Sequence, residues 1–168
     1  AGISFTGSTE VGTAITARGS ELLKKMQCEM GGKNAAIIMN DADLEKAVPG
    51  VVQGAFGSTG QRCTATSRAI VEDGIYDDFM SELVKQTSAL TIGDGMDETK
   101  DVAPLSSKNQ LDTVLEYIGV GTEEGAKLTL GGHHLQDGEF ADGYYVEPTI
   151  FEDVKSGMRI AQEEIFGP

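Results

Sequence analysis

Strand-like and helix-like segments alternate along the chain, and this alternation limits the fold more than any other feature of the sequence. Short β-branched or aromatic runs predict strands, and segments with apolar residues at helical spacing predict helices. The strand-like runs are 2–7, 25–30, 35–39, 68–72, 126–132 and 144–154, and the clearest helical segments are 8–23, 75–90 and 106–121. The pattern predicts an α/β fold with a mainly parallel sheet and flanking helices.

The stretch 40–60 is predicted to contain two helices rather than one. A helix is expected to begin at Asp41 and to end at Pro49 and Gly50. Because proline also starts helices well, a second helix is expected over 51–60.

Charge and cysteine usage exclude several classes of partner. The chain has 168 residues, with 13 basic and 27 acidic side chains, and 13 − 27 gives a net charge of −14. Such a charge repels nucleic acid and anionic membrane surfaces. No stretch is long and apolar enough to cross a bilayer. Two cysteines are too few for a disulfide framework, which favours a cytoplasmic location.

Three motifs that suggest a phosphate or metal site fail on spacing. "GSTEVG" lacks the lysine of a phosphate-binding P-loop, and "GVGTEEG" has its last glycine one position too late for a dinucleotide fingerprint. His133 and His134 are adjacent, with no third ligand at a useful spacing, so no metal site is predicted.

Cys63 lies in "FGSTGQRCTATSR", among small and polar residues. An arbitrary cysteine is more often a small buried residue at a helix end. Here the neighbours cannot form an apolar sleeve, and a positive Arg62 together with an expected helix N-terminus favours the reactive thiolate. Cys63 is therefore interpreted as a nucleophile.

Glu29, in "QCEMGGK", is the candidate base for this nucleophile. The only two histidines lie together in a distant polar loop, which argues against a cysteine protease. Strand alternation places Cys28 and Met30 on one face and Glu29 on the other, so Cys28 is expected in the core and Glu29 is free to face a cleft. The alternative is that Glu29 is a solvated glutamate on an edge strand.

Five segments in register resemble the NAD(P)-dependent aldehyde dehydrogenase superfamily. They are "FTGSTEVG", "EMGGKN", "DADLEKAV", "GQRCTATSR" and "EEIFGP", with Glu29 and Cys63 separated by 63 − 29 = 34 positions. The resemblance implies that residues 1–31 are the C-terminal end of a Rossmann-type cofactor-binding domain. It also implies that 32–168 are most of the catalytic domain, truncated at its C-terminal end, and that this piece alone is inactive.

The resemblance also implies a mechanism. Cys63 would attack the aldehyde carbon to give a thiohemiacetal, whose oxyanion the Cys63 backbone N–H partly holds. Hydride transfer would leave a thioester, and Glu29 would activate the water that hydrolyses it to a carboxylic acid. Arg62 and Thr64 are the candidate substrate-binding residues. Arg62 would suit a semialdehyde that carries a carboxylate, and the alternative is that it points away from the site into packing.

The cofactor implied by the resemblance is NAD or NADP. Gly7 and Ser8 resemble the site where a helix N-terminus meets the pyrophosphate. Gly31 belongs to a glycine pair that lets a ligand come close. Glu164 resembles the carboxylate that binds the nicotinamide ribose, and Phe166 the ring packed against the nicotinamide end.

Two alternatives and one departure from the family pattern remain. A coenzyme-A-acylating aldehyde dehydrogenase generally needs no carboxylate base, so Glu29 favours hydrolysis. A catalytically silent relative with a binding or structural role would be expected to lose Cys63 or Glu29. Gly57 and Ser58 stand where many relatives carry an aromatic residue and asparagine, which leaves the aldehyde substrate open. The resemblance further implies a homo-oligomer.

Overall fold

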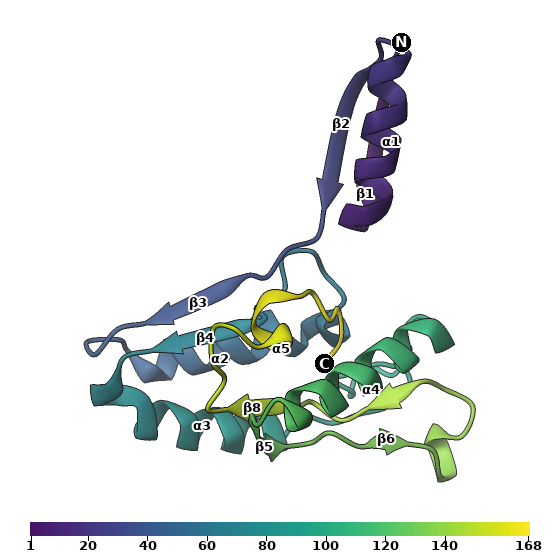
Figure 1. Ribbon diagram of the computed structural model, residues 1–168. Helices are drawn as coiled ribbons and strands as arrows, with labels where there is room; N and C mark the ends of the chain where they lie inside the picture. The colour runs from purple at the N-terminus through teal and green to yellow at the C-terminus, as the bar shows by residue number, and fades with distance from the viewer. The chain divides into compact units, whose positions relative to one another are not determined.

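The computed structural model describes all of residues 1–168, and the chain divides into two compact units, Ala1–Gly32 and Lys33–Pro168 (Figure 1). The division falls one residue after the expected boundary. Both units combine helices with parallel strands, and the chain has the α/β class expected from its sequence.

The first unit is a strand, a helix and a second strand. β1 (Gly2–Gly7) and β2 (Lys25–Met30) pair in parallel, and α1 (Thr9–Glu21) connects them. The helix can approach the strands because it carries glycine where they meet. A Cβ built on Gly12 or Gly19 would collide with the sulfur of Met30 or Met26. The methionines of β2 therefore face α1.

The second unit begins with a second parallel pair. β3 (Ala35–Ile38) and β4 (Arg68–Val71) are parallel, and α2 (Leu44–Phe56) and the 3-10 turn η1 (Gly57–Gly60) lie between them in the chain. After η2 (Asp73–Ile75), α3 (Tyr76–Ser88) packs beside α2. Residues of β3, α2 and α3 form the main core, in which the most deeply buried apolar side chains are Val48 and Phe79.

The prediction of two helices in 40–60 is wrong. α2 begins after Asp43, whose side chain accepts a hydrogen bond from the Glu45 N–H at 3.1 Å, and it continues through Pro49 to Phe56. Proline removes one hydrogen bond from the helix. Burial of four side chains on one face outweighs that loss, and these are Val48, Val51, Val52 and Phe56.

The second half of this unit contains one long helix and short antiparallel strands. α4 (Lys108–Glu123) starts at Ser107, whose hydroxyl accepts from the Gln110 N–H. β5 (Lys127–Leu130) pairs with β8 (Ile150–Glu152), and β6 (His134–Leu135) pairs with β7 (Tyr145–Val146). The turn η3 (Gly138–Phe140) separates β6 from β7, and the short helix α5 (Arg159–Gln162) follows β8. The longest strand pair, β1–β2, is thus parallel, as expected. The expected strand 144–154 is divided at Pro148 into β7 and β8.

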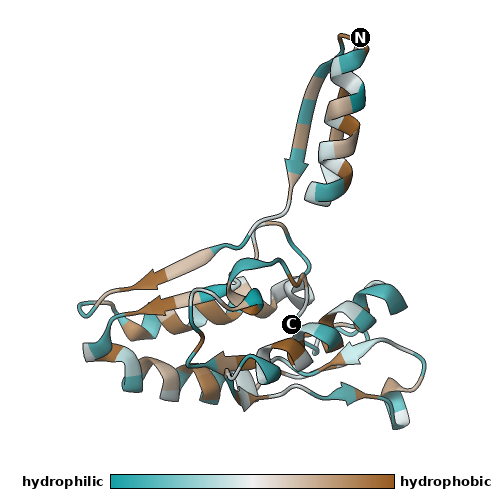
Figure 2. Cartoon of the chain, viewed as in Figure 1, coloured by the Kyte–Doolittle hydropathy of each residue, from teal (hydrophilic) through white to brown (hydrophobic).

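One face of the β3–β4 pair is apolar and open. Ile37 and Ile70 lie opposite each other in register and are 67% and 51% exposed, and Figure 2 shows both strands hydrophobic toward their ends. The next residues along the strands, Ile38 and Val71, belong to the core beneath. None of the helices is long and apolar enough to cross a membrane.

Candidate functional site

Cys63 lies in the irregular segment between η1 and β4, and its thiol is free and exposed. No helix begins at this position, so the expected helix N-terminus beside the thiol is absent. The polar neighbours that the sequence indicated are present. The segment is better described as a loop that presents a cysteine than as the end of a helix.

A left-handed turn precedes this loop. Ser58, Thr59 and Gly60 have φ values of 53°, 58° and 65°, a conformation that is unfavourable for a β-branched threonine. Thr59 is buried, and its hydroxyl donates to the Ala103 carbonyl at 2.9 Å. The Gln61 side-chain oxygen accepts from the Ser106 N–H at 3.0 Å. Residues distant in sequence thus stabilise a turn that local propensity would not form.

Arg62 points back toward α2 rather than out of the loop. Its Nη2 donates to the carbonyl oxygens of Gln53 and Gly54, at 3.0 and 3.4 Å, and its Nε is buried without a partner. A helix C-terminus is the partially negative end, so it suits a guanidinium. This placement favours a packing role for Arg62 over the expected role as a substrate ligand. Thr64 is exposed beside Cys63 in the same loop.

The C-terminal segment Glu163–Gly167 docks against the left-handed turn. A Cβ on Gly60 would collide with the carbonyl of Gly167, so the two backbones are in direct contact. The Gln110 side chain donates to the carbonyls of Ile165 and Phe166, at 2.8 and 3.0 Å. This brings the segment carrying Glu164 and Phe166 to the turn that leads into Cys63.

The preceding residue of this segment is fixed to α4. The Tyr117 hydroxyl donates to the Glu163 carboxylate at 2.6 Å, and Arg159 Nε donates to the same oxygen at 3.0 Å. These two hydrogen bonds lower the pKa of Glu163. Glu163 therefore has a structural partner, while Glu164, the predicted ribose ligand, has no side-chain hydrogen bond within the chain.

Lys33 adds a charge to this region that the sequence did not single out. It is half-buried, and burial lowers its pKa to about 8, assisted by the positive Arg68 and opposed by Glu164 and Glu163. The amine is thus close enough to the two carboxylates for their negative charge to stabilise its protonated form. No sequence signal identified it, because the effect depends on contacts across 130 residues of chain.

The predicted base lies in the first unit. Glu29 is exposed on β2, opposite Thr6 of β1, on the face away from α1. The two faces of the strand are those that alternation predicts. Cys28 is half-buried toward the helix rather than in the core, with its sulfur 3.3 Å from the Thr16 hydroxyl. The predicted base thus belongs to Ala1–Gly32 and the predicted nucleophile, Cys63, to Lys33–Pro168.

The predicted pyrophosphate site is the turn from β1 into α1. Gly7 ends the strand, and Ser8 is the N-cap, its hydroxyl accepting from the Val11 N–H at 3.3 Å. The first N–H groups of a helix have no acceptor within it and favour an anion. Gly31 directly follows β2 and is half-buried. The residues present thus fit a bound phosphate group.

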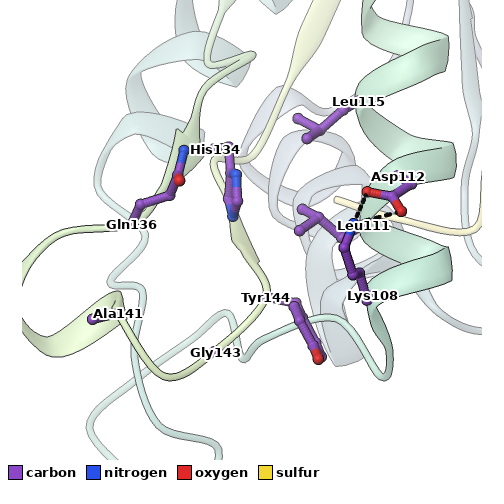
Figure 3. A pocket seen from close by; sticks show the side chains of 9 residues that line it. All are labelled: Lys108, Leu111, Asp112, Leu115, His134, Gln136, Ala141, Gly143 and Tyr144. Atoms are coloured by element: carbon purple, nitrogen blue, oxygen red, sulfur yellow. Dashed lines mark hydrogen bonds and ion pairs between the residues drawn. The ribbon is translucent and has the colours of Figure 1, made fainter.

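A groove elsewhere in the second unit contains none of the predicted site residues. It has a volume of about 460 Å³ and lies between α4 and the loop that carries β6 and η3 (Figure 3). Nine residues line it: Lys108, Leu111, Asp112, Leu115, His134, Gln136, Ala141, Gly143 and Tyr144. At its rim Lys108 is paired with Asp112 at 2.7 Å, so its charge is already neutralised.

Comparison with known proteins gives consistent matches. The family model described as the aldehyde dehydrogenase family matches residues 1–168. The chain is 52% identical over 166 residues to an α-ketoglutaric semialdehyde dehydrogenase of Bacillus subtilis, covering 99% of this chain and 34% of the relative. It is 45% identical to a betaine aldehyde dehydrogenase of the same organism, with the same coverage of each chain.

A solved structure agrees with these sequence matches. The NAD⁺ complex of an aldehyde dehydrogenase from Bacillus cereus superposes with a TM-score of 0.94 at 41% identity, covering 99% of this chain and 33% of that one. The chain therefore spans about a third of the length of the relatives it matches. Because the family model covers every residue, the chain belongs to the aldehyde dehydrogenase family.

Proposed function

We propose that the full-length protein oxidises an aldehyde to a carboxylic acid, with Cys63 as the nucleophile, Glu29 as the base, and NAD or NADP as the hydride acceptor. The observation that carries this proposal is the exposed, unpaired Cys63 thiol, in a loop joined through Gly60 to the segment that holds Glu164 and Phe166. Family membership supports the reaction class.

The chemical steps follow from these residues. The Cys63 thiolate attacks the carbonyl carbon, a C–S bond forms, and the C=O π electrons move to oxygen. The Cys63 N–H donates to that oxyanion. A bound nicotinamide would supply the hydride acceptor, and loss of the hydride from the same carbon would leave an acyl thioester on Cys63. Glu29 takes a proton from the attacking water, the C–S bond breaks, and the acid and the thiolate are released.

Two sets of residues would hold the dinucleotide. The N-terminus of α1, with Gly7 and Ser8, suits the pyrophosphate. Glu164, with no side-chain hydrogen bond of its own, suits a ribose hydroxyl, and Phe166 offers a ring that is 37% exposed. The name of the Bacillus cereus complex supports NAD⁺ as the first cofactor to test.

The proposed substrate class is a semialdehyde that carries a carboxylate. The support is the name of the 52% identical relative and not Arg62, whose guanidinium binds the carbonyls of α2. Betaine aldehyde, named for a 45% identical relative, is the competing substrate. Homo-oligomeric assembly and a cytoplasmic location remain predictions, the first from the family resemblance and the second from the cysteine content.

The test is a steady-state assay of the full-length protein with semialdehydes, betaine aldehyde and aliphatic aldehydes, each with NAD and with NADP. Cys63→Ser is expected to lower kcat by at least about a thousandfold, as loss of a nucleophile does. Cys28→Ser is the matched control, because Cys28 lies under α1, and its activity should stay within about threefold of the parent. Parental activity in Cys63→Ser would exclude the proposed nucleophile.

A further inference from the structure

Asn34 connects the start of β3 to the loop that carries Cys63. Its side-chain Nδ2 donates to the Cys63 carbonyl at 2.7 Å and to the Ala65 carbonyl at 3.2 Å. Its own carbonyl accepts from the N–H groups of Ser67 and Arg68, at 3.1 and 3.0 Å. One residue therefore binds both the nucleophile loop and the beginning of β4.

The orientation of the Asn34 amide is fixed by chemistry. Both partners are carbonyl oxygens, so only the NH₂ group can face them, and each of its two hydrogens has one acceptor. A side chain of the same shape without these hydrogens would place an oxygen against two carbonyl oxygens. The site therefore distinguishes asparagine from aspartate, although the two have nearly the same volume.

The two hydrogen bonds act on the backbone directly around the thiol. Fixing the Cys63 carbonyl fixes the peptide plane that follows Cys63. The Ala65 carbonyl belongs to the peptide whose Thr66 N–H donates to the Gly54 carbonyl at 3.0 Å, so Asn34 and α2 hold that peptide together. The loop has few other hydrogen bonds of its own, the Ala65 N–H to Arg62 carbonyl contact at 2.9 Å being one of them. Small displacements of a reacting group lower the rate steeply.

We propose that Asn34 is a positioning residue for Cys63: its side-chain amide holds the Cys63 and Ala65 carbonyls and so sets where the thiol points. This inference rests on the proposed role of Cys63 as the nucleophile. Asn34 itself touches no reacting atom. Its loss should therefore lower kcat and the reactivity of the thiol while leaving KM for aldehyde and cofactor nearly unchanged.

The experiment compares three variants of the full-length protein. Asn34→Asp keeps the shape and loses both donors, Asn34→Ala loses them without adding charge, and Asn34→His restores one ring N–H at a similar distance from the backbone. Asn109→Asp is the matched control, because Asn109 is exposed in the first turn of α4 and its side chain has no hydrogen bond. Each variant is checked for folding by its melting temperature.

Two readouts are measured for each folded variant. One is kcat and KM, and the other is the rate of Cys63 alkylation by iodoacetamide from about pH 6 to 9, followed by mass spectrometry. Asn34→Asp and Asn34→Ala are expected to lose about 10- to 100-fold in kcat, with an altered alkylation profile. Asn34→His should recover part of both, and Asn109→Asp should match the parent.

If Asn34 had only a structural role, its variants would melt at a lower temperature, and below that temperature both kcat and the Cys63 alkylation rate would equal those of the parent. Folded Asn34→Asp and Asn34→Ala variants with parental kcat and parental alkylation would therefore overturn the inference. Failure of the proposed function gives a different result. In that case the parent would show no Cys63-dependent oxidation, while alkylation of Cys63 would still respond to Asn34.

Discussion

Lys33 is the residue whose protonation should respond most clearly to its surroundings. Burial and the positive Arg68 lower its pKa from 10.5 to about 8 in the folded protein. Between these two values the unfolded chain binds more protons than the folded one, so the free energy of unfolding should rise as pH increases from 8 to 10.5. Below pH 8 the folded protein bears the full cost of the buried charge.

The prediction is that the rate at which acetic anhydride acetylates Lys33 reaches half of its maximum near pH 8, as mass spectrometry of the labelled peptides would measure. Lys127 is the internal control, because its hydrogen bond with Glu152 raises its pKa above the ordinary value of 10.5. Glu164→Gln should move the Lys33 midpoint lower, since Glu164 raises it. A Lys33 midpoint at 10.5 would contradict this account of its environment.

At the scale of elements, the contact between η1 and the C-terminal segment should be sensitive to an added methyl group. Gly60 has φ of 65°, and a Cβ there would meet the Gly167 backbone, which cannot move aside as a flexible side chain would. Gly60→Ala is expected to cost about 1–3 kcal/mol in the free energy of unfolding, measured by urea titration. Displacement of the Cys63 loop should also lower kcat about 10- to 100-fold.

Gly119→Ala is the matched control for this substitution. Gly119 is exposed in the middle of α4, with nothing within 4 Å of an added Cβ. Alanine should stabilise that helix by about 0.5–1 kcal/mol, the opposite sign to Gly60→Ala. Equal effects at the two positions would mean that the Gly60–Gly167 contact does not hold the turn.

Local signals predicted most elements, and tertiary contacts explain the exceptions. β1, α1, β2 and α4 were expected from β-branched runs and apolar periodicity, which are local signals. The caps of the two helices, Ser8 and Ser107, also act within one helical turn. The end of α2 was misplaced because the apolar face of that helix outweighs Pro49. Gln61 and Gln110 were missed because their partners, Ser106 and Ile165, lie about 50 residues away in sequence.

The site residues divide in the same way, into those that a local sequence signal identifies and those whose contacts are distant in the sequence. Cys63 and Glu29 were singled out from their immediate neighbours and are both exposed in the structure. The direction of Arg62 was not predictable, since the carbonyls of Gln53 and Gly54 face it only after α2 has formed. Asn34 carries no local signal for its role, because its two acceptors are about 30 residues away.

For the whole molecule, the central claim of the proposed function is that Cys63 and Glu29 act in successive steps of a single reaction. Cys63 comes from Lys33–Pro168 and Glu29 from Ala1–Gly32. If Glu29 acts only after hydride transfer, its loss should leave thioester formation intact and slow thioester hydrolysis. Cys63 would still be acylated, and hydrolysis would be slow.

The most direct measurement is therefore a rapid-mix assay of full-length Glu29→Gln with aldehyde and NAD⁺, with the protein mass recorded after the first turnover. We predict one equivalent of NADH per active site, an acyl group on the Cys63 peptide, and steady turnover slower than the parent by about 10²- to 10⁴-fold. Turnover at the parental rate, with no acyl group on Cys63, would contradict the claim.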